Sequence, residues 1–525
     1  MTSIDALTSK FIAHHLKYAP VDATFMAIPG HDAVLPPADA AAPSEERAAL
    51  QEMLTEHAGA AAPASRGEAM DAKLLSNVIG HSLRNLADRP RYRDPTWYTG
   101  ETVFGLISLL LPSAINPTTD SLASRLADIP RFLGQGETHL TGQAVSAGWV
   151  ARARKEVQVI TRLLQGRLQM HPLWRDTMQS LVSPALQAAA SFDAVVAAMP
   201  DADPRSGADH LDFVMREVHM LPLGADEALD RAEATIAKTR IELARMANSI
   251  DPSRDWQQQL ADLNNIRPES DQIINTYRAC HEQAMQGAAS LLTPATEYGL
   301  EFKPFPEWSQ GIYSDLYFLA YRCPPGANGG AGSVYWTSPP GQSSATIKST
   351  HAVHHGSIGH HTQNTRARVA PSRLARIVNQ GVARGIAFQA GGTMGEGWSC
   401  YVQDLMMEVP GFYSPAETLL ARSNELRNAA CLVADIKLHT KAWTIEEMRR
   451  YYRDEAGFPP ARVDFETVKN SLFPGNRLMY WLGVEQIKQA RARWNGSVSD
   501  FHDGLIARGH VPITWAIDDL FQSAA

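Results

Sequence analysis

The segment DEALDRAEATIAKTRIELARMANSI, residues 226–250, decides the fold class. Its apolar side chains recur every three or four positions, which is the spacing of one face of an α-helix; they are Ala228, Leu229, Ala232, Ile236, Ile241, Leu243 and Ala244. The pattern ends before Asp251-Pro252, where the proline is expected to stop a helix. Residues 142–166 repeat the spacing, with Val150, Val157, Ile160, Leu163 and Leu164. A mainly α protein is therefore predicted.

The character of the chain changes between residues 293 and 350. Two β-like runs, YFLAYRC (317–323) and SVYWT (333–337), flank PPGANGGAG (324–332), whose Pro, Gly and Asn content is typical of a hairpin loop. Helical patterns resume after residue 370. We expect an N-terminal helical region, residues 1–292, that forms one wall of a cleft. Residues 293–525 are expected to hold the functional site and a small β-hairpin or sheet element. The two regions together are expected to form one continuous structural unit.

Composition excludes several classes of protein. The chain has 525 residues, 44% hydrophobic and 20% charged, with a net charge of −8. That hydrophobicity argues against disorder, and the absence of a Lys/Arg-rich run argues against a nucleic-acid partner. The longest apolar run, LISLLL (106–111), is far shorter than the ~20 residues of a membrane span. With no secretion signal and no CxxC pair, we expect a cytoplasmic protein without a membrane partner and with reduced cysteines. The oligomeric state stays open.

A histidine cluster is the first candidate for chemistry. The segment STHAVHHGSIGHHTQN (349–364) contains five of the 18 histidines, namely His351, His354, His355, His360 and His361. Imidazole is the commonest metal ligand in proteins. His351 and His355 have the i, i+4 spacing of one helix face, whereas His354 and His360 are about 120° apart on a straight helix. Glycines 356 and 359 permit a bulge that brings these two together. The alternative is a His-rich loop or a pH-sensitive surface.

A carboxylate ligand has one candidate downstream. Catalytic zinc typically takes two histidines and one carboxylate and leaves a position open. The segment GGTMGEGWSCYVQDLMMEV (391–409) contains Glu396 near the start of a helical stretch. Taken alone, Glu396 is better interpreted as a first-turn carboxylate that the helix dipole stabilises.

Five ordered blocks resemble a known family, the bacterial domain-of-unknown-function family 885. HHGSIGHHTQ (354–363) is similar to its HEAxPGHHLQ motif, and EGWSCY (396–401) to its EGWALY motif. LVADIKLHTKAWT (432–444), FPGNRLMYWLG (473–483) and FHDGLIARGHVPI (501–513) are similar to its LVVDTGLHxxGW, PGQALSYxxG and FHDxLLxxGxxPL blocks. The resemblance covers nearly the whole chain. The family in turn resembles helical zinc metallopeptidases of the gluzincin type, which implies a large helical fold of that kind.

The resemblance implies a metal site. Carried over residue by residue, the ligands of one zinc ion, or of another divalent metal, are His354, His360 and Glu396, with His361 as the next choice for the second ligand. A peptide-like or small-molecule substrate is implied.

It also implies a group that stabilises an anionic tetrahedral intermediate. Tyr480 and His439 are the matching residues, and Tyr401 is a weaker match. Arg427 and Arg477 have the chemistry to bind a substrate carboxylate, although structural pairing is the commoner use of such residues.

The sequence departs from the family pattern at Ile358, which replaces a Pro, at Gln403, where many members have a second Glu, and decisively at one further position. His355 stands where the family has the glutamate that serves gluzincins as general base. Neutral histidine is a general base near neutral pH, so His355 is expected to be the base or else a further metal ligand. The predicted function is a zinc-dependent hydrolase of an amide, peptide-like or related small molecule. The alternatives are a metal-dependent lyase or isomerase on the same site, or a pseudoenzyme that binds without catalysis.

Overall fold

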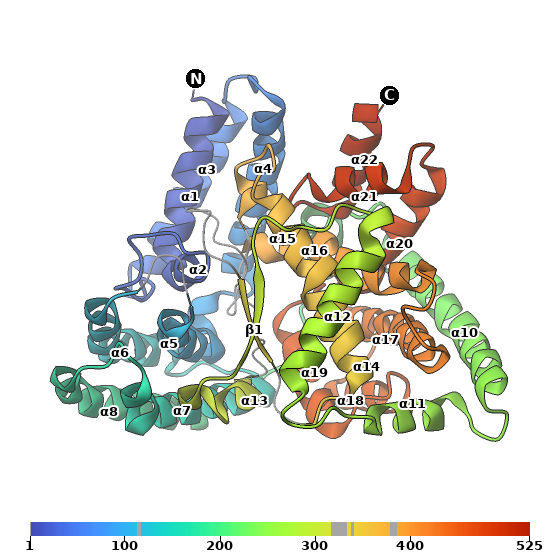
Figure 1. Cartoon of the computed structure of the whole chain (residues 1–525). Coiled ribbons are helices and arrows are strands. Elements are labelled where there is room, and N and C mark those ends of the chain that lie inside the picture. The colour runs from blue at the N-terminus through green and yellow to red at the C-terminus, as the bar shows by residue number, and fades with distance from the viewer. Residues whose placement is uncertain (1, 113–116, 317–332, 338–340, 378–385, 525) are drawn as a thin grey trace. The chain divides into compact units, whose positions relative to one another are not determined.

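The computed structural model describes residues 2–112, 117–316, 333–337, 341–377 and 386–524. These residues are mainly helical with one small sheet, which confirms the predicted fold class (Figure 1). Contacts divide the chain into two units. Unit 1 comprises residues 1–204, 305–331 and 371–388, and unit 2 comprises 205–304, 332–370 and 389–525. The boundary predicted at residues 292/293 lies inside unit 2.

Unit 1 is built from helices that the N-terminal sequence pattern predicts. Its α-helices are α1 (Ile4–Tyr18), α2 (Pro20–Phe25), α3 (Ala42–Ala58), α4 (Arg66–Asp88), α5 (Pro95–Leu110), α6 (Thr119–Leu140), α7 (Ala147–Arg162), α8 (Gln179–Ala197) and α13 (Ile312–Leu316). Among the described residues, one helical stretch, Asp176–Ala197, is long and apolar enough to cross a membrane by length and composition alone. Core helices pass the same test, and α8 buries one stripe made of Val182, Ala185, Ala189, Phe192 and Val196.

Unit 2 holds the rest of the helices and the sheet. Its α-helices are α9 (Ala208–Phe213), α10 (Ala225–Ile250), α11 (Trp256–Asn265), α12 (Ile273–Gly287), α14 (Ser344–Thr346), α15 (Thr362–Ala367), α17 (Pro415–His439), α18 (Ile445–Asp454), α19 (Pro460–Leu472), α20 (Leu478–Arg493), α21 (Val498–Ile506) and α22 (Ile513–Ala524). Helix α16 (Ile386–Leu405) lies mostly in this unit.

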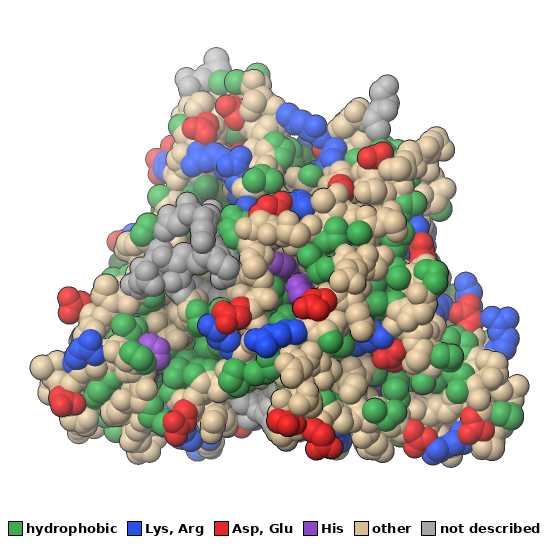
Figure 2. All heavy atoms as spheres, viewed as in Figure 1, with side chains coloured by type: hydrophobic (Ala, Val, Ile, Leu, Met, Phe, Trp, Pro, Cys, Tyr) green, Lys and Arg blue, Asp and Glu red, His purple; other side chains and the backbone are tan. Residues whose placement is uncertain are grey.

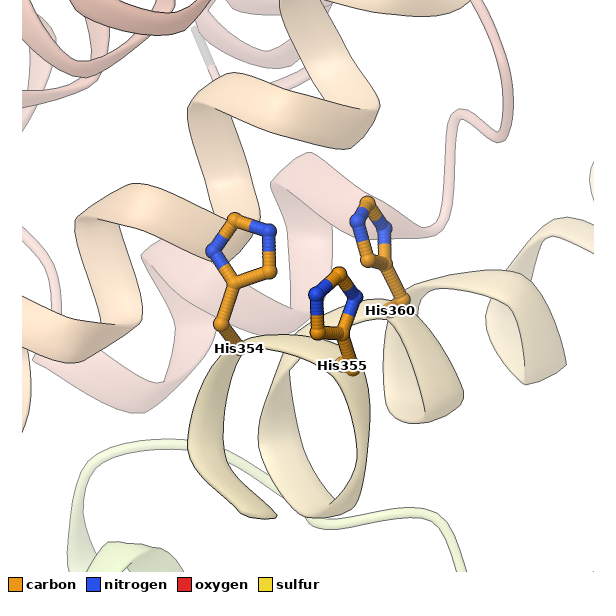
Figure 3. A group of neighbouring side chains, drawn as sticks. All are labelled: His354, His355 and His360. Atoms are coloured by element: carbon orange, nitrogen blue, oxygen red, sulfur yellow. The ribbon is translucent and has the colours of Figure 1, made fainter. Parts of the chain in front are cut away.

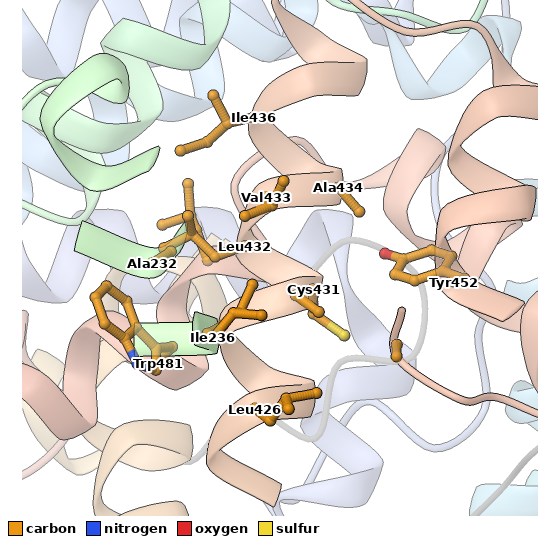
Figure 4. Packing of buried hydrophobic residues seen from close by; sticks show 14 of the residues in the cluster. Ala232, Ile236, Leu426, Cys431, Leu432, Val433, Ala434, Ile436, Tyr452 and Trp481 are labelled. Carbon is orange, nitrogen blue, oxygen red and sulfur yellow. The ribbon is translucent and has the colours of Figure 1, made fainter. Parts of the chain in front are cut away.

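The core of unit 2 forms where α10 packs along α17 (Figure 4). Ala232 and Ile236 of α10 meet Leu432 and Val433 of α17 in one buried cluster. The predicted helix over 226–250 is confirmed, but not every member of its apolar stripe is buried. Ile241 is 73% exposed, so including it in the core-facing set was wrong; the helix turns it away from α17.

The small sheet pairs β1 (Leu300–Pro304) with β2 (Ser333–Thr337) in parallel, with Leu300 opposite Ser333 and Pro304 opposite Thr337. The run SVYWT is confirmed as a strand, and all five of its residues are buried. A tight hairpin turn cannot join parallel strands, so the pairing differs from a hairpin. The other predicted run, 317–323, lies outside the described residues.

Charged side chains of both signs are interspersed over the face in Figure 2, without one large basic patch.

Candidate metal centre

Two π-helical segments, η8 (Ile347–His355) and η9 (Ser357–His361), carry the histidine cluster. Gly356 separates the two segments, and the chain kinks inside η9, where Gly359 has φ −80° and ψ −123°. A Cβ at this position would lie 1.9 Å from the carbonyl oxygen of His354, so only glycine fits. The wider π turns and the kink bring the rings of His354 and His360 to 5.0 Å between centroids. A straight α-helix would keep these two rings apart. Gly356 and Gly359 allow the backbone to leave the α-helical path, so the rings can approach each other.

Side chains donate hydrogen bonds to backbone carbonyl groups at the kink. The Trp398 Nε1–H group donates to the carbonyl oxygen of Ile358 at 2.9 Å, and the Thr362 hydroxyl donates to that of Ser357 at 2.6 Å. Ser357 itself has φ +29°, an uncommon value for a residue other than glycine. Because buried carbonyl groups need partners, these contacts hold the irregular backbone in one conformation.

Glu396 of α16 completes the group. Its Oε2 atom is 3.4 Å from Nε2 of His354 and 3.6 Å from Nε2 of His360. Two ligand atoms on one tetrahedral zinc ion, each about 2.0–2.1 Å from the metal, lie about 3.3 Å apart. Glu396 lies in the middle of α16, not in its first turn. Its interpretation as a carboxylate stabilised by the helix dipole is therefore wrong, because that effect fades beyond the first turn.

His355 belongs to the same group of side chains. Figure 3 shows the imidazoles of His354, His355 and His360 standing on the same side of the π-helical segments. Each offers a ring nitrogen, and these three atoms lie within 4.8 Å of one another. In the described part of the chain, His355 makes no hydrogen bond, whereas His351 pairs with the Tyr335 hydroxyl at 2.7 Å. The ring of His355 is thus free for a ligand or a proton.

Gln403 fixes the orientation of His354. Its Nε2 group donates to the carbonyl oxygen and the hydroxyl of Ser349, at 3.0 and 2.9 Å. This leaves its Oε1 atom, 3.2 Å from Nδ1 of His354, as an acceptor. Nδ1 therefore carries a hydrogen, and Nε2 is the ring nitrogen that faces Glu396.

The electrostatics of the group suit a cation. Burial disfavours the charged form of Glu396, but hydrogen bonds from His354 and His360 outweigh it and hold the pKa well below its usual value. For His354, burial is outweighed by Cys400 and Glu396, which raises its pKa to about 9. Burial and the charge on neighbouring histidines lower the pKa of His355 well below its usual value. His355 is therefore neutral at neutral pH.

Helix α20 brings Tyr480 to this group. The Asp435 carboxylate accepts hydrogen bonds from the backbone N–H groups of Gly475, Arg477 and Leu478, which anchors the start of the helix. A Cβ on Gly397 would lie 2.6 Å from Cα of Gly483, so α16 and α20 cross in close contact. Burial and the charge of Glu396 raise the pKa of Tyr480 well above its usual value. Its hydroxyl therefore remains a hydrogen-bond donor.

Helix α17 does not bring His439 to the group. His439 is fully buried, and its ring contacts the carbonyl oxygen of Asn470 at 2.9 Å and the backbone N–H of Ser206 at 3.2 Å. Asn428, on the same helix, contacts Cys400 beside His354, and His439 lies eleven residues further along, about 16 Å at helical rise.

Two other candidates also have partners elsewhere. His361, the next choice for second ligand, donates from Nε2 to the carbonyl oxygen of Tyr298 at 3.1 Å, and burial lowers its pKa to about 4. The hydroxyl of Tyr401 contacts Nε2 of His502 at 2.9 Å and accepts from Arg491 at 3.0 Å. Neither side chain contributes to the group around Glu396.

The sequence patterns left three neighbours of His354 without a role: Gln403, Cys400 and Asn428. The Cys400 sulfur is 3.8 Å from Nδ1 of His354, and Asn428 donates to that sulfur at 3.4 Å. Sequence spacing could have indicated Cys400 and Gln403, because they share one face of α16 with Glu396 at positions i, i+4 and i+7. Asn428 has no such signal, since it comes from another helix.

Comparisons with known proteins agree with the fold. Among curated proteins, none matches the chain. A "putative lipoprotein of unknown function" from Shewanella oneidensis superposes with a TM-score of 0.74 at 16% identity, over 99% of this chain and 100% of that one. A "putative lipoprotein" from Colwellia psychrerythraea superposes with a TM-score of 0.75 at 16% identity, over 100% and 99%. The family pattern described as "Bacterial protein of unknown function (DUF885)" matches residues 20–516. The chain therefore belongs to the DUF885 family.

Proposed function

We propose that this protein is a zinc-dependent hydrolase of an amide, peptide-like or related small-molecule substrate. The observation that carries the proposal is the convergence of three donor atoms, with Glu396 Oε2 at 3.4 and 3.6 Å from the Nε2 atoms of His354 and His360. Two imidazoles and one carboxylate are the donor set of gluzincin-type sites, and the spacing fits one ion. The likeness to gluzincins is part of the proposal.

The residues fit a divalent cation in charge as well as in spacing. Glu396 is ionised, and the contact of Gln403 with Nδ1 leaves Nε2 of His354 facing it, where it would bind a metal ion after losing its proton. A bound zinc ion would supply Lewis-acid chemistry, lowering the pKa of water and polarising a carbonyl group. His354, His360 and Glu396 would hold it.

His355 supports hydrolysis as the general base. It stands where the family has glutamate, it is neutral, and its ring nitrogens have no partner among the described residues. A water molecule beside Glu396 would lose its proton to a ring nitrogen of His355, which later returns it to the leaving amine. Tyr480 would donate its hydroxyl hydrogen to the oxygen of the carbonyl group as negative charge develops there.

A second candidate function follows if His355 is a metal ligand instead of a base. The nitrogens of His354, His355 and His360 lie within 4.8 Å of one another, which also suits three histidine ligands on one ion. With Glu396 as the fourth, no position stays open on a tetrahedral ion. A protein that binds without catalysis would fit that site better than a hydrolase.

Metal analysis with matched variants tests the ligand set. The purified protein is expected to hold one zinc ion per chain. Glu396→Ala should weaken zinc binding by more than roughly 100-fold. Loss of a residue that only hydrogen-bonds a metal ligand already lowers metal affinity about 10–100-fold, and Glu396 would be a ligand itself. Glu408→Ala, further along the same helical run and paired with Arg491, should leave it unchanged. Absence of any transition metal, or equal affinity in Glu396→Ala, would refute the proposal.

Two substitutions at residue 355 distinguish the candidates. In the hydrolase, His355→Ala keeps zinc affinity and loses turnover of a synthetic peptide mixture followed by mass spectrometry, and His355→Glu gains peptidase activity. In the four-ligand site, His355→Ala weakens zinc binding and His355→Glu gains no peptidase activity.

Location and partners stay predictions. Both similar structures are titled "putative lipoprotein". Cell fractionation would therefore test the expected cytoplasmic location against a lipid-anchored one. A small-molecule or peptide-like substrate, without nucleic acid or membrane, remains the expectation for partners.

A further inference from the structure

Arg427 of α17 is a partly buried cation without a counter-charge. In the described part of the chain it makes no hydrogen bond and no ion pair. Burial and the neighbouring Arg462 lower its pKa to about 10, so the guanidinium group stays charged at neutral pH. A charge held out of water without a partner costs free energy. Arg427 therefore needs a reason other than stability.

The carboxylates in this part of unit 2 already have partners. Glu466 pairs with Arg462 at 3.4 Å and with Arg477 at 3.2 Å. The carboxylate of Asp435 accepts three backbone N–H groups at the start of α20. Cations thus outnumber the free carboxylates around Arg427, and the local balance favours an anion from outside the chain.

Helix α17, which carries Arg427, reaches the candidate metal centre through Asn428. Asn428, the next residue after Arg427, donates to the Cys400 sulfur at 3.4 Å, and that sulfur is 3.8 Å from Nδ1 of His354. On the other side, the guanidinium group of Arg477 lies 4.5 Å from the ring centre of Tyr480.

Cys431 links the two arginines. It lies four residues after Arg427, on the same face of α17, and its sulfur accepts a hydrogen bond from Arg477 at 3.4 Å. Figure 4 shows the Cys431 side chain in the buried cluster of unit 2. The side of α17 that carries Arg427 and Cys431 therefore lies beside Arg477, which in turn contacts Tyr480.

We propose that Arg427 binds a carboxylate of the substrate, so that the substrate class is an acid whose amide bond lies close to a free carboxylate, such as an N-acyl amino acid or the C-terminal end of a short peptide. This inference rests on the proposed function of the same site. The planar guanidinium fork binds a carboxylate through two parallel hydrogen bonds. Binding of the substrate carboxylate by Arg427 would hold the amide bond at the metal centre.

The test compares two probes that differ only in charge, hippurate and its primary amide hippuramide. Binding is measured by calorimetry on chelator-treated protein, so that a metal ion cannot bind the carboxylate. Wild type should bind hippurate about tenfold more tightly than hippuramide, the typical gain of a charged hydrogen-bonded pair. Arg427→Met should abolish that preference. Arg449→Met, which removes a surface arginine paired with Asp464, should preserve it.

Thermal unfolding separates a binding role from a structural one. Arg427→Met should unfold at a higher temperature than wild type, because it removes an unpaired buried charge. Arg477→Met should unfold at a lower temperature, because it breaks a pair with Glu466. Equal affinity of wild type for both probes, a preference that survives in Arg427→Met, or a lower unfolding temperature of that variant would overturn the inference. Zinc content is measured separately, so its absence would refute the metal centre without changing these outcomes.

Discussion

Gln403 decides which nitrogen of His354 faces Glu396. Its amide group is held by Ser349, so only its oxygen remains for Nδ1 of His354. Sequence spacing places Gln403 on the same helix face as Glu396, but the contact to His354 spans 49 residues. No local pattern could predict it.

Gln403→Leu should weaken zinc binding about 10–100-fold, because His354 loses the acceptor that fixes its tautomer. Gln403→Glu keeps an acceptor and should retain most of the affinity. Competition with a fluorescent chelator measures both values. Equal affinity in Gln403→Leu and wild type would show that Gln403 does not orient the ligand.

Zinc affinity should depend on pH through His354. Its pKa is raised to about 9, so pairing with Glu396 stabilises the metal-free fold fully below its ordinary pKa and loses this contribution as pH rises through about 9. A zinc ligand must be neutral, so binding releases that proton. The apparent Kd for zinc should fall about tenfold per pH unit from pH 7 to pH 9. A flat Kd over this range would contradict a charged His354.

Among the secondary-structure elements, the π-helical segments η8 and η9 bring the histidines of the site together. Glycines 356 and 359 in the sequence permit the bulge that joins His354 and His360, so this part of the site was predictable. The choice between Tyr480 and His439 was not, because it depends on how α16 and α20 cross and on where α17 ends. The parallel sheet was also missed, because its first strand, LEFKP, is short, ends in a proline and buries only Phe302, which makes its alternating pattern a weak signal.

Gly359→Ala tests the kink. The added methyl group would lie 1.9 Å from a backbone oxygen, so the backbone must shift, at a cost of about 1–3 kcal/mol or more, and zinc binding should fall with it.

Gly395→Ala is the matched control. Its Cβ would meet no atom within 4 Å, and an alanine inside α16 should stabilise the fold by about 0.5–1 kcal/mol. Chemical denaturation and zinc titration of both variants give the comparison. Two variants that respond alike would show that the kink is not specifically required.

At the scale of the whole molecule, every residue of the candidate metal centre belongs to unit 2. A ligand stabilises the part of a protein that it binds. Zinc should therefore slow amide hydrogen exchange in residues 347–367 and 389–405. It should leave α1 to α8 of unit 1 unchanged. Protection in unit 1 alone, or none at all, would place the zinc elsewhere or refute its binding.

The most direct measurement is anomalous diffraction from zinc-soaked crystals at the zinc absorption edge. The metal centre predicts one strong peak within about 2.0–2.2 Å of Nε2 of His354, Nε2 of His360 and an oxygen of Glu396. A map without a peak between these three atoms, or with its only strong peak at other side chains, would contradict it.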